Sequence, residues 1–111
     1  MGCAFWFSSL ESVEVDVDEV TEKHALGWFK EIFKEVFDEA YKSPDDGRRM
    51  VLDSALAEIF YISAQALAEK TIKDEELDLL LSSYIIVKMH GHRQLVEKVR
   101  LLLKRVLVRS L

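Results

Sequence analysis

Apolar side chains recur at spacings of three and four along most of this chain, which is the pattern of α-helices that bury one face. Four stretches carry the pattern, at about 19–42, 46–70, 73–89 and 92–110. Residues typical of turns separate them at 43–47, around 71–74 and at Gly91. We therefore predict an all-α fold, a four-helix up-and-down bundle with short connections.

The apolar positions also predict which side of each helix faces the core. On the first helix they are Phe29, Ile32, Phe33, Val36, Phe37, Ala40 and Tyr41; on the second, Leu52, Ala55, Leu56, Ile59, Ile62, Ala66 and Leu67; on the last, Leu95, Val96, Val99, Leu102, Leu103, Val106 and Leu107. The stretch 77–89 is apolar nearly all round. We expect this third helix to be the most buried of the four.

The start of the chain follows a different period. Val13, Val15 and Val17 alternate with acidic residues, as in a half-buried strand, and residues 4–7 offer a second strand for a hairpin. An irregular segment is the alternative, because an isolated hairpin is marginally stable in water. We divide the chain into a short N-terminal β or irregular arm, 1–17, and a helical bundle domain, 18–111. We also expect the arm to cover Trp28, at the edge of the first helix's apolar side.

Composition places the chain among single-domain globular proteins. It has 111 residues, of which 50% are hydrophobic and 32% charged. Its one cysteine, Cys3, excludes an internal disulfide, and we expect a cytoplasmic protein without a signal peptide or membrane span. Asparagine is absent while charged residues are frequent, which favours a thermophilic source.

Charge is distributed unevenly along the chain, whose formal net charge is −5. Residues 1–83 hold 19 acidic and eight basic residues, whereas residues 84–111 hold seven basic residues and one acidic residue. On the last predicted helix the basic residues form two stripes. One stripe is Arg93, Arg100 and Lys104, with Glu97 among them, and the other is Lys98, Arg105 and Arg109.

Two aliphatic residues, Leu101 and Val108, lie between these stripes and opposite the predicted core side. A pair of this kind, two turns apart and flanked by basic residues, indicates a second contact surface. The predicted protein interface comprises Leu101, Val108, Arg100, Lys104 and Arg105. The favoured function is a non-catalytic structural or adaptor subunit that self-associates or joins a larger assembly.

Two other interpretations of the basic helix stay open. In the first, its charges simply face the acidic helices of the same bundle. In the second, the chain is a nucleic-acid-associated helical protein or small ribonucleoprotein subunit that uses Lys98, Arg100, Lys104, Arg105 and Arg109. The acidic overall balance and the lack of aromatic residues among these bases count against nucleic acid.

Candidate residues for chemistry are few, and we expect no enzyme, metal site or cofactor. His90 and His92 are spaced by two, which on a helix would point them apart, and no C-x-x-C, H-x-x-x-H or E-x-x-H pair occurs. Most paired carboxylates stand at predicted helix starts, where capping explains them. A buried carboxylate or histidine facing a polar cavity would reopen the question of catalysis; Asp53 and Glu58 are candidates if buried.

Overall fold

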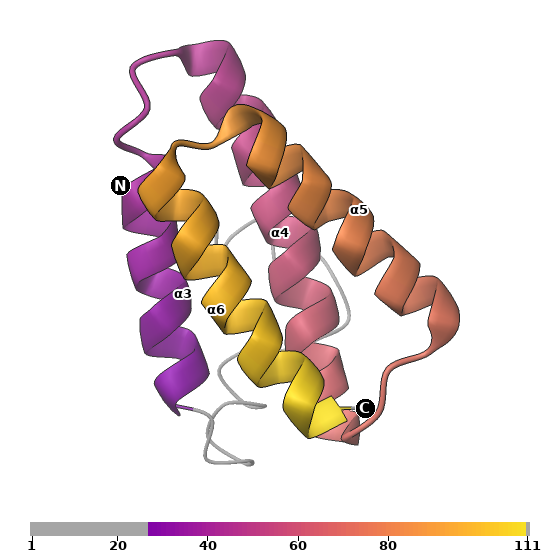
Figure 1. Ribbon diagram of the computed structural model, residues 1–111. Helices are drawn as coiled ribbons and strands as arrows, with labels where there is room; N and C mark the ends of the chain where they lie inside the picture. The colour runs from indigo at the N-terminus through magenta and orange to yellow at the C-terminus, as the bar shows by residue number, and fades with distance from the viewer. Residues whose placement is uncertain (1–26, 111) are drawn as a thin grey trace.

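A computed structural model of the protein describes residues 27–110. Within them lie α3 (Gly27–Ala40), α4 (Asp46–Glu69), α5 (Asp74–His90) and α6 (Arg93–Ser110). Successive helices run in opposite directions, which confirms the predicted all-α up-and-down bundle (Figure 1). The predicted arm, 1–17, and the part of the first predicted helix before residue 27 lie outside the described residues.

The helix ends follow the capping residues that the sequence offers. Asp45 caps α4, because its side chain accepts a hydrogen bond of 3.0 Å from the backbone N–H of Arg48. Glu76 caps α5 by accepting from the backbone N–H of Lys73, also at 3.0 Å. Gly91 ends α5, and its N–H donates to the carbonyl of Val87. These caps place the boundaries within one residue of the predicted ones.

The central helix of the bundle is α4, not α5. Ten residues of α4 are buried, whereas α5 buries only Leu80, Ser83 and Val87. The prediction that the third helix is the most buried is therefore wrong. Apolar side chains all round a helix can be buried on every side. They are buried only on the sides where a neighbouring helix packs against them, however, and the sequence of α5 does not specify those neighbours. Helix α5 lies at the edge of the bundle, mainly against α4, and contacts α6 less (Figure 1).

Aromatic side chains join α3 to α4 in the core. Phe33 and Phe60 stack edge to face with ring centroids 4.3 Å apart, and Phe29 lies 5.4 and 5.2 Å from them. All three are buried. Phe29, Phe33 and Phe37 therefore form core, as the sequence predicted; Trp6 and Phe7 lie outside the described residues.

By length and composition, α4 is also apolar enough to cross a membrane. Within the bundle, however, 56% of that apolar window is buried against the other helices. A central core helix has the same composition because it must exclude water on several sides. The core position of α4 therefore accounts for its apolar character.

A substitution at Gly91 tests the tight connection between α5 and α6. A Cβ atom there would lie 2.7 Å from the carbonyl oxygen of Val87 and 3.0 Å from Leu95 Cδ2. We expect Gly91→Ala to destabilise the protein by about 1–3 kcal/mol, because backbone cannot yield as a flexible side chain does. Thermal unfolding followed by circular dichroism measures the change.

The control is Gly27→Ala, because no atom lies within 4 Å of the Cβ it would add. We expect this control to leave the melting temperature unchanged or slightly raised, since alanine favours helix. Equal effects of the two substitutions would contradict the described packing at Gly91.

Candidate functional site

One side of α6 lies against α3 and includes half of the predicted basic residues. The guanidinium carbons of Arg105 and Arg109 lie 4.1 and 5.2 Å from the ring centroid of Trp28. On the same side, Lys98 Nζ lies 3.9 Å from a carboxylate oxygen of Glu35. This stripe therefore makes contacts within its own bundle. The arm that the sequence predicts over Trp28 lies outside the described residues.

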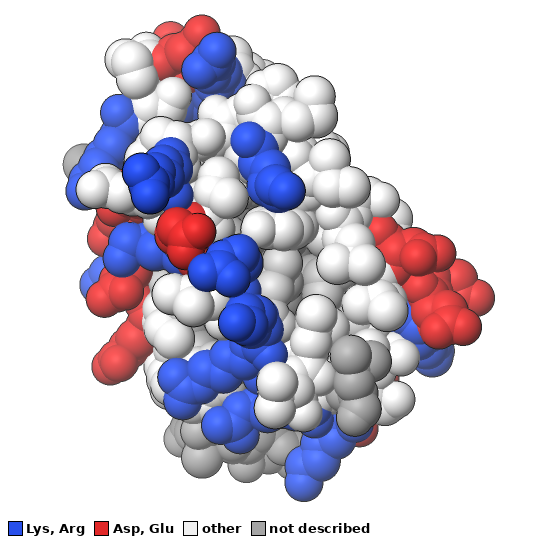
Figure 2. All heavy atoms as spheres, in the orientation of Figure 1, with Lys and Arg blue, Asp and Glu red and all other residues white. Residues whose placement is uncertain are grey.

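The other stripe, Arg93, Arg100 and Lys104, is exposed. Arg100 Nη2 donates a hydrogen bond of 3.0 Å to Glu97, and this contact lowers the pKa of the Glu97 carboxyl. Figure 2 shows basic side chains following α6 down the front of the molecule. The bundle thus divides the predicted basic residues between two sides of α6, with Arg105 on the α3 side and Arg100 and Lys104 away from it.

Leu101 and Val108 are strongly exposed, with 57% and 82% of their surfaces accessible. Seven residues apart on one helix, they lie on the same side. This is the side that the sequence placed opposite the core, and neither side chain belongs to the buried cluster. Both residues are therefore free of the core and accessible to a partner.

Helix α5 adds apolar surface that sequence reasoning missed, because it assigned this helix to the core. Its exposed large apolar residues are Leu79, Leu81, Ile85, Ile86 and Met89. Leu81 and Ile85, spaced by four, lie on one side of the helix. Tyr84, between them in sequence, packs against the core instead, and α5 as a whole contacts α6. The exposure of each residue depends on where α5 packs, which the apolar pattern does not specify.

The opposite side of α5 borders a shallow, mainly apolar groove shared with α4. Leu79 and Ile86 contribute from α5, and Met50 and Val51 from α4. The groove has a volume of about 560 Å³, and its remaining lining residues are Ser54, Ala55, Glu58, Ser82 and Ser83. Glu58 is half-buried there, beside apolar and hydroxyl side chains and away from any histidine.

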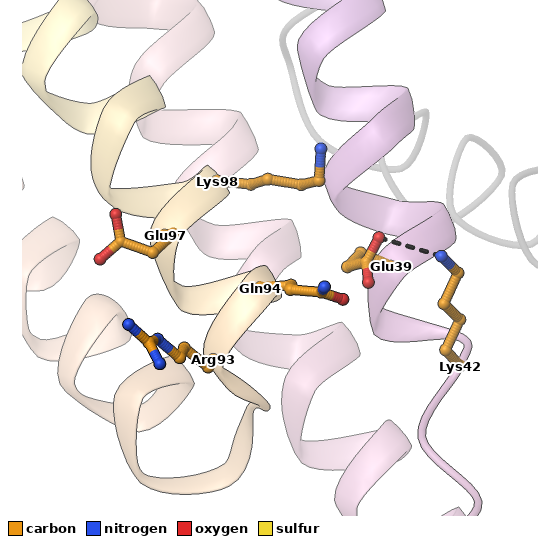
Figure 3. A pocket seen from close by; sticks show the side chains of 6 residues that line it. All are labelled: Glu39, Lys42, Arg93, Gln94, Glu97 and Lys98. Carbon is orange, nitrogen blue, oxygen red and sulfur yellow. Dashed lines mark hydrogen bonds and ion pairs between the residues drawn. The ribbon is translucent and has the colours of Figure 1, made fainter.

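A polar pocket of about 650 Å³ lies between α3 and the start of α6. The least exposed residue that lines it is Glu39, of which only 7% is accessible. His92 Nε2 lies 3.0 Å from Glu39 Oε1, and Lys42 Nζ donates to Glu39 Oε2 at 3.2 Å. Gln94 and Lys98 reach toward α3, whereas Arg93 and Glu97 point to the other side of α6 (Figure 3).

Glu39 is a buried carboxylate that faces a polar pocket, which is the arrangement that would reopen the question of catalysis. Its pKa and its hydrogen bonds therefore bear on whether it can transfer a proton. The hydrogen bond with His92 and the charge and hydrogen bond of Lys42 lower the pKa of Glu39, despite opposition from its burial. A general acid or base works best with a pKa near the working pH, and both oxygens of Glu39 are already engaged. The lining of this pocket includes no serine, threonine or cysteine, whereas an adjoining pocket that Glu39 also lines includes Ser43. This arrangement is that of an anchor that joins α3 to the α5–α6 connection.

Asp53, the other carboxylate singled out from the sequence, is half-buried. Burial raises its pKa, although Tyr41 Oη donates a hydrogen bond of 3.2 Å to it. This contact links the end of α3 to α4. Among residues 27–110, no group of three or more histidine, cysteine, aspartate or glutamate side chains is arranged to hold a metal ion.

The Glu39 anchor predicts how stability depends on acid. Because folding lowers the pKa of Glu39, the unfolded chain takes up a proton first as the pH falls. The contribution of the ionised carboxylate is complete above the usual glutamate value of 4.5 and is lost as the pH falls through the lower folded-state pKa. Urea unfolding across that range should show this loss, and Glu39→Gln should flatten it.

At neutral pH, Glu39→Gln should also lower the melting temperature by a few degrees, because the ion pair with Lys42 is lost and the hydrogen bond with His92 is weakened. Glu31→Gln, on an exposed residue of the same helix, serves as the control and should change neither property. An acid dependence identical in wild type and Glu39→Gln would rule out the anchor as its source.

Comparison with known proteins does not assign this chain to a family. No protein-family model, no curated protein and no solved structure matches it. A function for the chain therefore has to be inferred from the geometry of its described residues.

Proposed function

We propose that the protein is a non-catalytic structural or adaptor subunit that binds protein through one face of α5 and α6. One observation carries the proposal: four large aliphatic side chains are exposed on two neighbouring helices. They are Leu81, Ile85, Leu101 and Val108, and between 42% and 82% of each is accessible. Single exposed aliphatic residues are ordinary, but a group of them on adjoining elements is typical of an interaction site.

Neighbouring charges fit the rim of a protein interface. Arg100 and Lys104 are exposed and lie beside Leu101 on α6. Arginine is enriched at protein interfaces, and both side chains have long apolar stems that can cover a partner's surface while their charges stay hydrated. A binding surface of this kind needs no nucleophile, metal or pocket.

The nucleic-acid alternative has less support. Its five basic residues are divided, because Lys98, Arg105 and Arg109 lie along α3 near Glu35 and Trp28. The outer stripe includes the acidic residue Glu97. Nucleic acid favours clustered positive charge with aromatic side chains for stacking, and α6 has no aromatic residue. The cytoplasmic location and thermophilic source remain predictions from the sequence.

Photo-crosslinking in the native host tests the proposal. A photoreactive amino acid at Ile85 or Leu101 should form adducts with protein, because both positions face the predicted partner. The same probe at Glu31, an exposed residue of α3, should form none and provides the matched control. Absence of adducts from both Ile85 and Leu101 would refute a protein-binding role for this face.

Charge placed on the aliphatic pair should abolish the contact. We expect Leu101→Glu with Val108→Glu to remove the adducts formed from position 85 and to lower the mass of any assembly. The fold should survive, because both side chains are outside the core. Circular dichroism checks this, and Met50→Glu, an exposed apolar residue on α4, is the control. An undiminished adduct in the folded double variant would exclude the pair from the interface.

A further inference from the structure

The exposed side of α5 changes in character along its length. Asp74, Asp78, Leu81 and Ile85 are spaced by four, three and four residues, which places them on one side of the helix. Leu81 and Ile85 are exposed there, and the acidic residues precede them at the start of the helix. This side is therefore acidic at its N-terminal end and apolar along its middle, and Lys88, three residues after Ile85, adds a basic group toward its C-terminal end.

The adjoining side of α6 has the opposite charge. Arg93, Arg100 and Lys104 follow the same spacing of three, four or seven residues and lie beside the exposed Leu101. Figure 2 shows the result on one face of the molecule: basic groups along α6, acidic groups over the N-terminal end of α5, and mainly uncharged surface between them.

Local effects explain only part of this arrangement. Glu76 is used as a helix cap, and Asp74 and Glu75 lie in the first turn, where the helix dipole favours acidic groups. Asp78 lies beyond that turn. Neither capping nor the dipole explains why Asp78 of α5 and Arg100 and Lys104 of α6 lie beside exposed aliphatic residues of the same two helices.

From this charge pattern we infer that the occupant of the face is a second copy of the same chain. The inference rests on the proposed function and names its partner. A two-fold axis that lies in the interface, between α6 and the N-terminal end of α5, exchanges the two sides of the face. It places Arg100 and Lys104 of each copy opposite Asp74 and Asp78 of the other, beside the exposed aliphatic residues of α5 and α6.

Self-complementarity favours this occupant over others. The basic region of one copy can contact the acidic region of an identical copy. Two-fold symmetry repeats this contact, so the pairing needs no second kind of protein. A nucleic acid on the same face would approach Asp74 and Asp78 as well as the bases. Of the other charged residues near this face, Glu97 is paired with Arg100, and Lys88 Nζ lies 5.7 Å from the ring centroid of Tyr84.

Reversal of charge on each side separately tests the inference. Sedimentation of the wild type should give about twice the chain mass of 12.8 kDa at high concentration. Arg100→Glu with Lys104→Glu should weaken dimerisation by about a hundredfold, because it sets acid against acid at both contacts. Asp74→Lys with Asp78→Lys should do the same by setting base against base.

An equimolar mixture of the two reversed variants should dimerise again, since one copy now presents only acidic and the other only basic groups. Lys34→Glu with Arg48→Glu makes the same change in net charge elsewhere on the surface, and should leave the wild-type dimer intact. If lysine at the start of α5 unfolds the acidic-side variant, Asp78→Lys alone replaces it, because this residue lies outside the first turn.

The outcomes separate this inference from the proposed function. A wild type that stays monomeric at millimolar concentration, a dimer indifferent to both reversals, or a mixture that stays monomeric would overturn the two-fold contact. If position 85 or 101 nevertheless forms adducts with a different protein, the face still binds protein and only the identity of the partner is wrong. Adducts of doubled chain mass, with recovery in the mixture, support both.

Discussion

The burial of α4 on several sides is the interaction on which the rest of the structure depends. Leu52, Leu56 and Ile59 are fully enclosed, and Phe60 completes the aromatic contact with α3. Burial of a large aliphatic or aromatic side chain stabilises a fold by roughly 1.5–3 kcal/mol. With α4 at the centre, each of the other three helices buries mainly one side. The residues on their outer sides are not needed for the core and can therefore be charged or apolar.

The outer sides of α5 and α6 differ in composition. Helix α5 needs only Leu80, Ser83 and Val87 for its place beside α4, so its remaining apolar residues meet solvent. Helix α6 buries a broad apolar side and turns one basic stripe toward α3 and the other outward. Exposed aliphatic side chains that add nothing to the core are a cost in water, which association would remove.

Glu39 shows how one buried charge fixes the relation between distant segments. It stands near the end of α3, yet its carboxylate meets His92, which precedes α6 by one residue. A carboxylate at this depth needs partners, and His92 and Lys42 supply them. The same contacts lower the pKa of Glu39 and hold the end of α3 against the connection between α5 and α6.

The sequence by itself determined the described helices, the ends of α4 and α5, and most of the core sides. Apolar spacing and capping groups such as Asp45 act within a few residues, so they can be read locally. Only the tertiary structure decided which helix is central and which apolar residues of α5 stay exposed, because exposure depends on neighbours distant in sequence. It also decided which of the two predicted basic stripes of α6 faces α3, since nothing near Arg105 in the chain reveals that Trp28 lies beneath it.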